Sequence, residues 1–238
     1  MLDVVHDDTD FLVVNKPAGL VCHPTKDGEM SSLIGRVRLY LGHAEGRLIN
    51  RLDRETSGLV VIGKDAVTAG GLGKLFAGSS VTKHYWAIVH GHVETDRIMD
   101  IDGAIGKDTA SAVVIKDCVR ADGAPALTRI VVIERLSYEG RPMTWLLVMP
   151  ATGRKHQIRI HLAHIGHPIV GDKIYGGDEG RYLRFVSGVQ TPADRQALIV
   201  ANHALHAQAL RFVWRDEHWA FRVEPDAAFG AMLTSCRS

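Results

Sequence analysis

The chain has 238 residues, of which 46% are hydrophobic and 23% are charged, a composition typical of a folded globular protein that excludes disordered and collagen-like classes. Its 28 Lys and Arg residues are balanced by 27 Asp and Glu residues, and a formal net charge of +1 by itself argues against a nucleic-acid-binding protein. Three scattered cysteines exclude a disulfide framework and a zinc site of the CxxC type, and no secretory signal or apolar stretch of the ~20 residues that span a bilayer is found. We therefore expect a soluble cytoplasmic protein.

Short apolar runs rich in β-branched residues, each bounded by Gly, Pro, Asp or Asn, predict strands along much of the chain. These runs are Phe11–Lys16, Leu59–Ile62, Lys83–Val89, Thr128–Leu136 and Thr144–Met149. Near the C-terminus, Ala209–Trp214 and Trp219–Val223 flank the polar turn Arg215–His218, which predicts a hairpin.

Helix signals are fewer. Asp65 can cap a helix whose apolar residues recur with helical spacing, and the same spacing predicts a helix over Lys155–Ile165. Thr191, followed by Pro and Asp194, predicts a capped helix that runs toward Asn202. Because strands outnumber helices and do not alternate with them, we expect an α+β fold with a mixed, largely antiparallel β-sheet core and flanking helices. No linker-like segment divides it, so we expect a single domain over residues 1–238.

A charged loop precedes the predicted strand Leu59–Ile62. It reads Arg47-Leu-Ile-Asn-Arg51-Leu-Asp53-Arg54-Glu55-Thr-Ser-Gly58. A carboxylate between two arginines is expected to stay ionised, because opposite charge within ~4–6 Å lowers the pKa of an acid. The loop is either a surface turn with a salt-bridge cluster or a site built around an ionised Asp53.

A second polar cluster lies at the start of the predicted helix Lys155–Ile165, where Gly153 precedes the run Arg-Lys-His-Gln. A helix N-terminus already favours anions, so this concentration of donors indicates a phosphate-binding surface, although a solvated helix face has the same pattern. In a third segment, the alternation of a strand puts Lys83 and Tyr85 on one face, where the tyrosine either stacks on a base or packs in the core.

Three histidines spaced by three residues, His161, His164 and His167, raise the possibility of a metal site. We expect no metal there, because the HExxH pattern is absent, no carboxylate lies at ligand spacing, and the neighbouring arginines repel a cation. The chain also has no P-loop, no GxGxxG after a strand and no GxSxG elbow.

Four blocks occur together in chain order: Arg51-Leu-Asp53-Arg54-x-Thr56-Ser57-Gly58, Lys83-x-Tyr85, Gly153-Arg154-x-His156-Gln157-Ile158-Arg159-x-His161 and Gly171-Asp172-x-x-Tyr175-Gly176. They follow the segment Phe11-Leu-Val-Val-Asn15-Lys16-Pro17-Ala-Gly19. In this combination the chain resembles the RluA-type family of RNA pseudouridine synthases from about Val5 to about Pro225.

The resemblance implies an isomerase that converts uridine in RNA to pseudouridine. Asp53 matches the family's essential aspartate, which acts either as a nucleophile toward the ribose or as a base on it. Tyr85 matches the active-site tyrosine that packs on the target base and is a candidate for proton abstraction from C5. Arg159 matches the arginine that pairs with the catalytic carboxylate, a pairing that would keep Asp53 ionised and oriented.

The resemblance also implies an RNA-binding surface. Arg51 matches an arginine that helps to hold the target nucleotide out of its stack. The other expected RNA-binding residues are Arg54, Lys83, Arg154, Lys155 and His156. The implied partner is ribosomal or transfer RNA, and the implied reaction needs no metal or organic cofactor. We expect no membrane association and a monomer.

The chain departs from the family pattern at two positions. Asn50 stands where the family usually has His, and Lys155 stands where Thr or Ser is common. We expect both to alter RNA fit without removing activity. There is no room for the S4 RNA-binding domain that many relatives carry, so we expect the catalytic domain itself to recognise the RNA. The segment from about Gly177 to about Ala201 receives no role.

Two other functions compete with this interpretation. A catalytically silent RNA-binding module would share the scaffold, but the intact Asp53, Tyr85 and Arg159 argue against it. A metal-dependent hydrolase built on the three histidines predicts inhibition by chelators.

The near-neutral net charge is the sum of strongly basic and strongly acidic segments of the chain. Residues 151–176 carry Arg154, Lys155, Arg159 and Lys173 against Asp172, a net charge of +3, whereas residues 1–10 carry four Asp and no Lys or Arg, a net charge of −4. We therefore expect one positive zone around Asp53 on an otherwise balanced surface, which favours docking of a structured RNA over indiscriminate polyanion binding.

Overall fold

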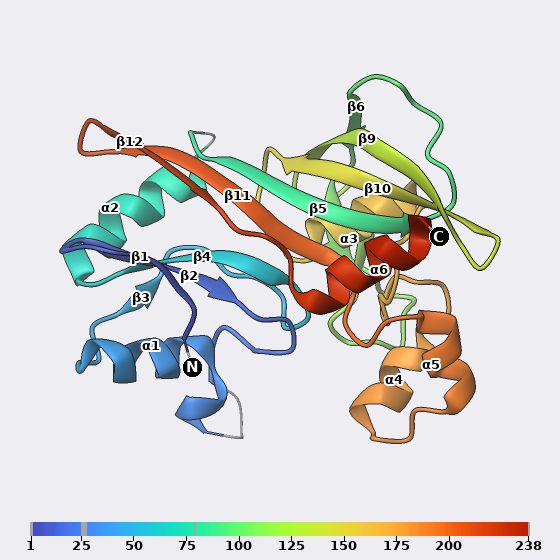
Figure 1. The fold of residues 1–238 in the computed structure, drawn as a ribbon, viewed down its shortest axis with the longest axis horizontal. Coiled ribbons are helices and arrows are strands. Elements are labelled where there is room, and N and C mark those ends of the chain that lie inside the picture. Colours follow the sequence, from blue (N-terminus) through green and yellow to red (C-terminus); the bar gives the residue numbers. More distant parts are fainter. Residues whose placement is uncertain (1, 25–27, 79, 238) are drawn as a thin grey trace. The chain divides into compact units, whose positions relative to one another are not determined.

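The computed structural model describes residues 2–24, 28–78 and 80–237. These residues group into two compact units. Figure 1 shows the chain coloured from the N-terminus in blue to the C-terminus in red. Unit 1 comprises residues 1–84 and 206–226, and unit 2 comprises residues 85–205 and 227–238. The chain therefore passes from one unit to the other three times, within β5 (Thr82–His90), within β11 (Leu205–Trp214) and between Asp226 and Ala227. The single domain over residues 1–238 stays a prediction.

Unit 1 is built on antiparallel strands that the sequence marks by apolar runs. Its elements are β1 (Val4–Asp7), β2 (Phe11–Lys16), the 3-10 turn η1 (Glu29–Ser31), α1 (Leu33–Leu41), β3 (Arg47–Leu48), β4 (Ser57–Gly63), α2 (Ala66–Ala77), most of β11, and β12 (Glu217–Arg222). Strand β2 pairs antiparallel with both β1 and β4, and β12 pairs antiparallel with β11. The exception is β11, which runs parallel to β4 where His206 lies opposite Ser57.

The core of unit 1 follows the alternation of its strands. Phe11 and Val13 of β2 pack with Leu72 and Phe76 of α2, and α1 covers the opposite face of these strands in Figure 1. Every residue of β4 is buried, because both of its faces are covered. Strand β4 is therefore a rigid support for the loop that precedes it, which contains Asp53.

In unit 2 the strands pair antiparallel: β5 with β10 (Arg141–Pro150), β10 with β9 (Leu127–Tyr138), and β9 with β6 (Met99–Asp102). A separate small hairpin joins β7 (Ile105–Lys107) to β8 (Asp117–Val119). The helices of the unit are α3 (Gln157–His164), α4 (Gly180–Val186), α5 (Pro192–Leu198) and α6 (Ala227–Arg237). Leu162 of α3 and Met232 of α6 join the core formed by the large sheet.

The predicted α+β class with a largely antiparallel sheet is confirmed, and all five predicted single strands lie within observed ones. The hairpin turn is shorter than predicted: only Arg215 and Asp216 separate β11 from β12, and both have positive φ, 51° and 63°. This left-handed pair matches the twist of the flanking strands, so they can be joined by two residues.

The helix predictions hold in part. Asp65 caps α2 and Thr191 caps α5 in a complete capping box, as expected. Helix α3 begins at Gln157 and not at Lys155, because His156 adopts the left-handed conformation with φ 56°. The α5 segment ends at Leu198 and does not reach Asn202. None of the helices in the described ranges is long and apolar enough to cross a membrane.

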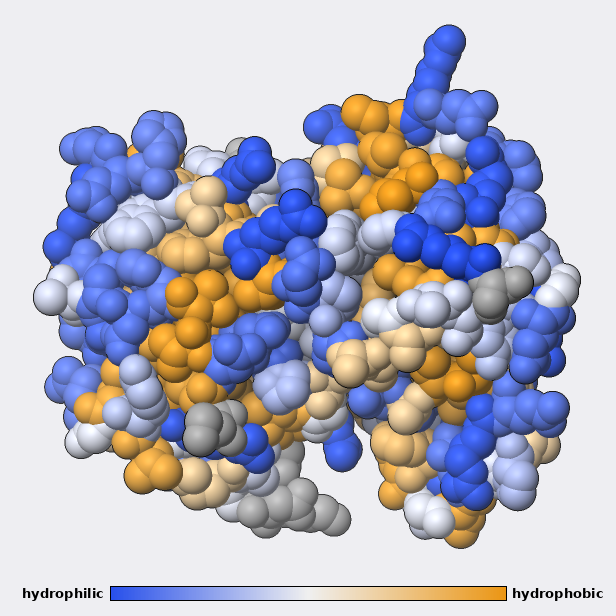
Figure 2. Space-filling model, in the orientation of Figure 1, coloured by the Kyte–Doolittle hydropathy of each residue, from blue (hydrophilic) through white to orange (hydrophobic). Residues whose placement is uncertain are grey.

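The segment from Gly177 to Ala201, which had no predicted role, contains α4 and α5. Arg184 of α4 binds both carboxylate oxygens of Asp194 in α5 at 2.8 and 2.5 Å. Helix α4 also leaves Leu183 and Val186 exposed, and hydrophobic side chains reach the surface among hydrophilic ones in this region of Figure 2. An ion pair thus links the two short helices.

Candidate active site

Asp53 lies where the sequence predicts, in the loop that enters β4. Its side chain is half-buried, and its carbonyl accepts a hydrogen bond from Thr56 N at 3.1 Å, which closes a turn. Gly58, just inside the strand, has φ +112° and would place a Cβ 2.3 Å from the backbone oxygen of Ala207. Only glycine allows this close approach of β4 and β11.

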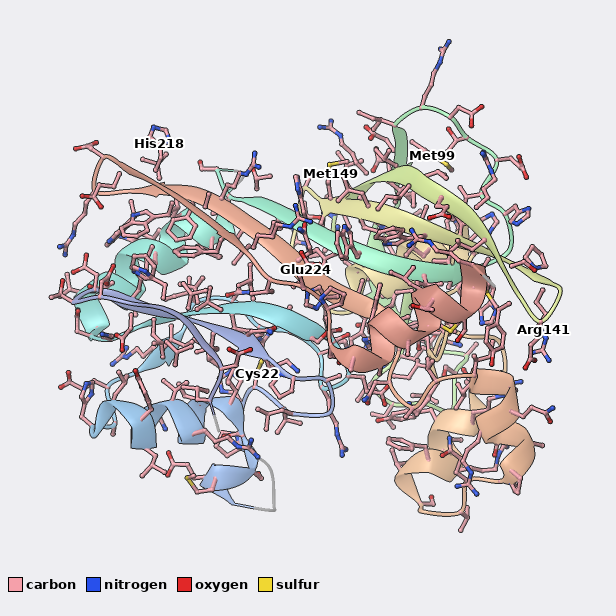
Figure 3. The ribbon with its side chains drawn as sticks, in the orientation of Figure 1. Cys22, Met99, Arg141, Met149, His218 and Glu224 are labelled. Atoms are coloured by element: carbon pink, nitrogen blue, oxygen red, sulfur yellow. The ribbon has the colours of Figure 1, made fainter. Side chains whose placement is uncertain are left out.

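The backbone on each side of Asp53 is pinned to the loop after β2. The Cys22 thiol, labelled in Figure 3, donates to Leu52 O at 3.3 Å and accepts from Leu52 N at 3.4 Å. Gly19 N donates to Arg54 O at 2.8 Å. Burial raises the pKa of Cys22, so the sulfur stays a neutral thiol that can make both bonds.

Ser57 extends this support to β11. Its hydroxyl lies 2.9 Å from His206 Nδ1, and the other ring nitrogen of His206 donates to Val223 O at 3.2 Å. Burial lowers the pKa of His206, so the neutral ring can accept from Ser57 while it donates to the carbonyl. The loop of Asp53 is therefore held from both ends.

Lys16 is a site residue without a predicted role. Its side chain is completely buried, and its ammonium donates to three carbonyl oxygens, those of Pro17 at 3.0 Å, Leu20 at 2.8 Å and Arg54 at 3.1 Å. Burial lowers the pKa of Lys16 to about 8, opposed by the charge of Asp53 among others, so the group still carries its charge at neutral pH. Three acceptors need three N–H donors, which agrees with an ammonium.

We expect Lys16→Met to destabilise unit 1 by about 3 kcal/mol, because it leaves buried carbonyls without donors. Urea denaturation measures the effect, with the exposed Lys74→Met as the control. Since the pKa of Lys16 in the folded chain, about 8, lies below its ordinary 10.5, the unfolded chain holds this proton more tightly. The free energy of unfolding of the wild type should therefore exceed that of Lys16→Met by a growing amount as pH rises from about 8 to 10.5. A difference that stays constant over this range would contradict the lowered pKa of Lys16.

The predicted RNA-binding residues of unit 1 have different surroundings. Arg51 is exposed, and its charge, after burial, helps to lower the pKa of His23. Arg54 is exposed and donates from Nε to Gly19 O at 3.2 Å. Lys83 is half-buried, with its ammonium 5.8 Å from the centre of the Phe76 ring, and burial lowers its pKa.

Asn50, the first departure from the family pattern, has a structural role. Its side-chain oxygen accepts from Val61 N at 2.8 Å, and its side-chain nitrogen donates to Leu59 O at 3.2 Å. The amide thus pairs with the edge of β4 as a neighbouring strand would.

In unit 2, Arg159 forms a buried bidentate ion pair with Asp172. Nε and Nη2 donate to the two carboxylate oxygens at 2.7 and 2.9 Å, and the side chains are only 7% and 0% exposed. Burial alone would raise the pKa of Asp172, but the charge and hydrogen bonds of Arg159 hold it well below its usual range. Sequence reasoning assigned no role to Asp172, although it belongs to the block Gly171-Asp172-x-x-Tyr175-Gly176. The pairing of Arg159 with Asp53 stays a prediction.

Tyr175 lies against the same arginine, with the guanidinium carbon 5.1 Å from the centre of its ring. Its hydroxyl accepts from Asp117 N at 3.3 Å and shares a hydrogen bond with His156 Nδ1 at 3.0 Å. Burial raises the pKa of Tyr175, so the phenol stays neutral. His156, a predicted RNA-binding residue, is therefore held by Tyr175.

The two remaining basic residues at the start of α3 also contact protein groups. Arg154 donates from Nε to Pro125 O at 3.2 Å, and Lys155 forms an ion pair with Asp117 at 2.7 Å while remaining about half exposed. Tyr85 lies in β5 opposite Val148 of β10 and is partly buried against the core of unit 2. Of the predicted catalytic residues, Asp53 thus belongs to unit 1, and Tyr85 and Arg159 belong to unit 2.

The histidine series shows no sign of ligand geometry. His161 is buried, with Nδ1 2.9 Å from Thr128 Oγ1 and Nε2 2.8 Å from Gly103 O. Both ring nitrogens are thus engaged by protein groups. Within residues 2–24, 28–78 and 80–237, no group of three His, Cys, Asp or Glu side chains is arranged to hold a metal ion.

Comparison with known proteins gives one consistent family. Residues 10–164 match the RNA pseudouridylate synthase family. The chain is 34% identical over 218 residues to the dual-specificity RNA pseudouridine synthase RluA of Vibrio parahaemolyticus, covering 91% of this chain and 80% of that protein. It is 32% identical over 182 residues to the ribosomal large subunit pseudouridine synthase D of Buchnera aphidicola, covering 74% of this chain and 55% of that protein.

Solved structures agree. The human RNA pseudouridylate synthase domain containing 1 superposes with a TM-score of 0.74 at 30% identity, covering 95% of this chain and 84% of that one. The human RNA pseudouridylate synthase domain containing 4 gives a TM-score of 0.72 at 25% identity, covering 98% and 92%.

Proposed function

This chain belongs to the RNA pseudouridylate synthase family, which confirms the resemblance seen in its motifs, and we propose that it isomerises a specific uridine of ribosomal or transfer RNA to pseudouridine. The observation that carries the proposal is the way in which hydrogen bonds fix the loop that contains Asp53. The family motif presents the half-buried carboxylate of Asp53 on a loop whose backbone is bound on both sides, by Cys22 and by Lys16. A catalytic group that must reach one particular atom of a nucleotide requires such a rigid support.

In the proposed reaction, the N-glycosidic bond of the target uridine breaks, the uracil rotates, and a carbon–carbon bond to the ribose replaces the bond that was lost. Asp53 acts either as a nucleophile on the ribose or as a base that removes a proton from it. Tyr85 packs on the uracil and is the candidate for removing the C5 proton. Arg159 orients the carboxylate and keeps it ionised.

RNA binding is assigned to the basic residues near these positions. Arg51 is exposed, as a side chain that enters the RNA must be, and it would help to hold the target nucleotide out of its stack at a cost of a few kcal/mol. The backbone-positioning groups in the proposal are Arg54, Lys83, Arg154, Lys155 and His156.

The substrate class is inferred from two relatives, one named for the large ribosomal subunit and one for dual RNA specificity. The chemistry rearranges atoms that the substrate already contains, so the proposed reaction uses no metal and no organic cofactor. We further propose that the protein acts in the cytoplasm, which its few scattered cysteines support, and that it is a monomer without membrane association.

The function is tested by mapping pseudouridines in total RNA from cells with and without the gene, and by incubating the purified protein with ribosomal and transfer RNA transcripts. We expect one uridine, or a small set, to lose its modification without the gene and to gain it in vitro with or without EDTA. Unchanged maps together with no activity on either RNA would refute the proposal.

Arg154→Ala is expected to weaken RNA binding while leaving turnover at saturating RNA nearly unchanged, because the residue contacts backbone phosphate and not the reacting atoms. Losing one phosphate contact should lower the slope of log Kd against log salt by about 1. Fluorescence titrations at several salt concentrations measure this slope. Arg97→Ala, an exposed arginine in the β5–β6 connection, is the matched control and should leave the slope unchanged.

A further inference from the structure

The loop after α3 contains an arrangement that the proposed reaction does not yet explain. Asp172 is completely buried and accepts four hydrogen bonds, two from the Arg159 guanidinium and two from the backbone nitrogens of Ile174 and Tyr175 at 2.9 and 3.0 Å. Its loop is tightly packed: Gly171 has φ +82° and would place a Cβ 2.6 Å from Val200. The carboxylate therefore has little freedom to move.

We propose that Asp172 and Tyr175 are positioning residues that fix the guanidinium of Arg159 in one orientation for the reaction. This inference rests on the proposed function, in which Arg159 orients the catalytic carboxylate.

Two contacts from different residues define the orientation. Asp172 binds the edge formed by Nε and Nη2, which sets the rotation of the guanidinium in its own plane and directs Nη1 to the side away from Asp172. The Tyr175 ring lies against the arginine at 5.1 Å and restricts tilting of that plane. An arginine side chain otherwise samples many rotamers, so the two contacts remove freedom that would have to be lost in every turnover.

Unit 2 provides a comparison for this pair. Arg184 and Asp194 also form a bidentate ion pair, with the Asp194 side chain 6% exposed, but they link α4 to α5 and include no residue of the proposed site. Asp194→Asn therefore weakens a bidentate pair of the same unit, although its arginine is 36% exposed, and its effect measures what stability loss alone does to the rate.

The test uses the full-length protein and the RNA transcript identified by pseudouridine mapping. Single-turnover rates at saturating RNA, RNA Kd and thermal stability are measured for Asp172→Asn, Tyr175→Leu, Tyr175→Phe and Asp194→Asn. We expect Asp172→Asn to lower the single-turnover rate by about 100-fold, as misplacement of a catalytic group does, with Kd within about threefold. Tyr175→Leu should lower the rate by about tenfold, and Tyr175→Phe, which keeps the ring, should stay within about threefold.

A spectroscopic measurement reports on the arginine directly. The Nε–H proton of Arg159 should give a slowly exchanging NMR signal in the wild type that is lost in Asp172→Asn and kept in Asp194→Asn. Asp172→Glu, which keeps the charge, should recover part of the rate.

The proposal is wrong if folded Asp172→Asn keeps its single-turnover rate, or if Asp194→Asn loses as much. If Asp172→Asn does not fold, Tyr175→Leu decides, and an unchanged rate overturns the proposal. Failure of the proposed function gives a different result, since wild-type protein would then form no pseudouridine while the NMR signal would still show whether Asp172 holds the guanidinium.

Discussion

Replacing Asp53 by Asn is expected to lower the rate of pseudouridine formation by at least about 10³-fold at saturating RNA. Asn has nearly the same shape as Asp, so the loop should keep its contacts to Cys22, Gly19 and Lys16, which all involve backbone atoms of neighbouring residues. What disappears is the negative charge, and both proposed routes need it, one as a nucleophile on the ribose and the other as a base.

The rate is measured by following pseudouridine in a defined transcript under single-turnover conditions. Glu55→Gln, in the same loop and also half-buried, is the matched control and should keep the rate within about threefold. Asp53→Asn protein that binds RNA normally and retains full pseudouridine formation would remove Asp53 from the proposed mechanism.

Arg159→Ala is expected to affect stability and turnover together. It leaves the Asp172 carboxylate, 0% exposed, without its counter-ion, and breaking one side of a buried ion pair typically costs about 3–5 kcal/mol. Turnover should fall by about 100-fold or more, and RNA affinity should fall much less, because the arginine orients the catalytic carboxylate in the proposed reaction. Arg159→Lys keeps the charge but cannot form the bidentate pair, and we expect it to restore stability only in part.

The stability effect has a defined pH dependence. Arg159 holds the pKa of Asp172 below its ordinary 3.8, against the opposing effect of burial, so the pair stabilises the folded chain fully above about pH 4. As pH falls and the carboxylate becomes protonated, the difference between wild type and Arg159→Ala should shrink. Denaturation curves between pH 3 and pH 7 measure this, and a difference that grows toward low pH would contradict the assignment.

Two controls separate the effects of Arg159→Ala. Arg184→Ala disrupts the bidentate pair between α4 and α5 of unit 2 and should lower stability without lowering turnover of the folded protein. The double variant Arg159→Ala with Asp172→Ala removes both charges, so it should be less destabilised than Arg159→Ala alone but equally slow.

The local elements of this fold could be predicted because their signals lie within a few residues. The apolar run Phe11–Lys16 coincides with β2, and Asp65 and Thr191 cap α2 and α5 through bonds to residues two or three positions away. Helices α1, α4 and α6 were not predicted. Helix α1 nevertheless carries local signals, since Ser32 caps its start and Gly42 ends it in the left-handed conformation.

The candidate site divides in the same way. The sequence by itself determined that Asp53 lies in a loop entering a buried strand, since the loop and the apolar run are adjacent along the chain. It could not show that Asp172 holds Arg159 or that three carbonyls surround Lys16. The ion pair between Arg159 and Asp172, thirteen positions apart, and the hydrogen bond from Lys16 to Arg54 both require the tertiary fold to bring separate segments of the chain close together. The tertiary structure alone decided these contacts, because burial sets which opposite charges and which donors must meet.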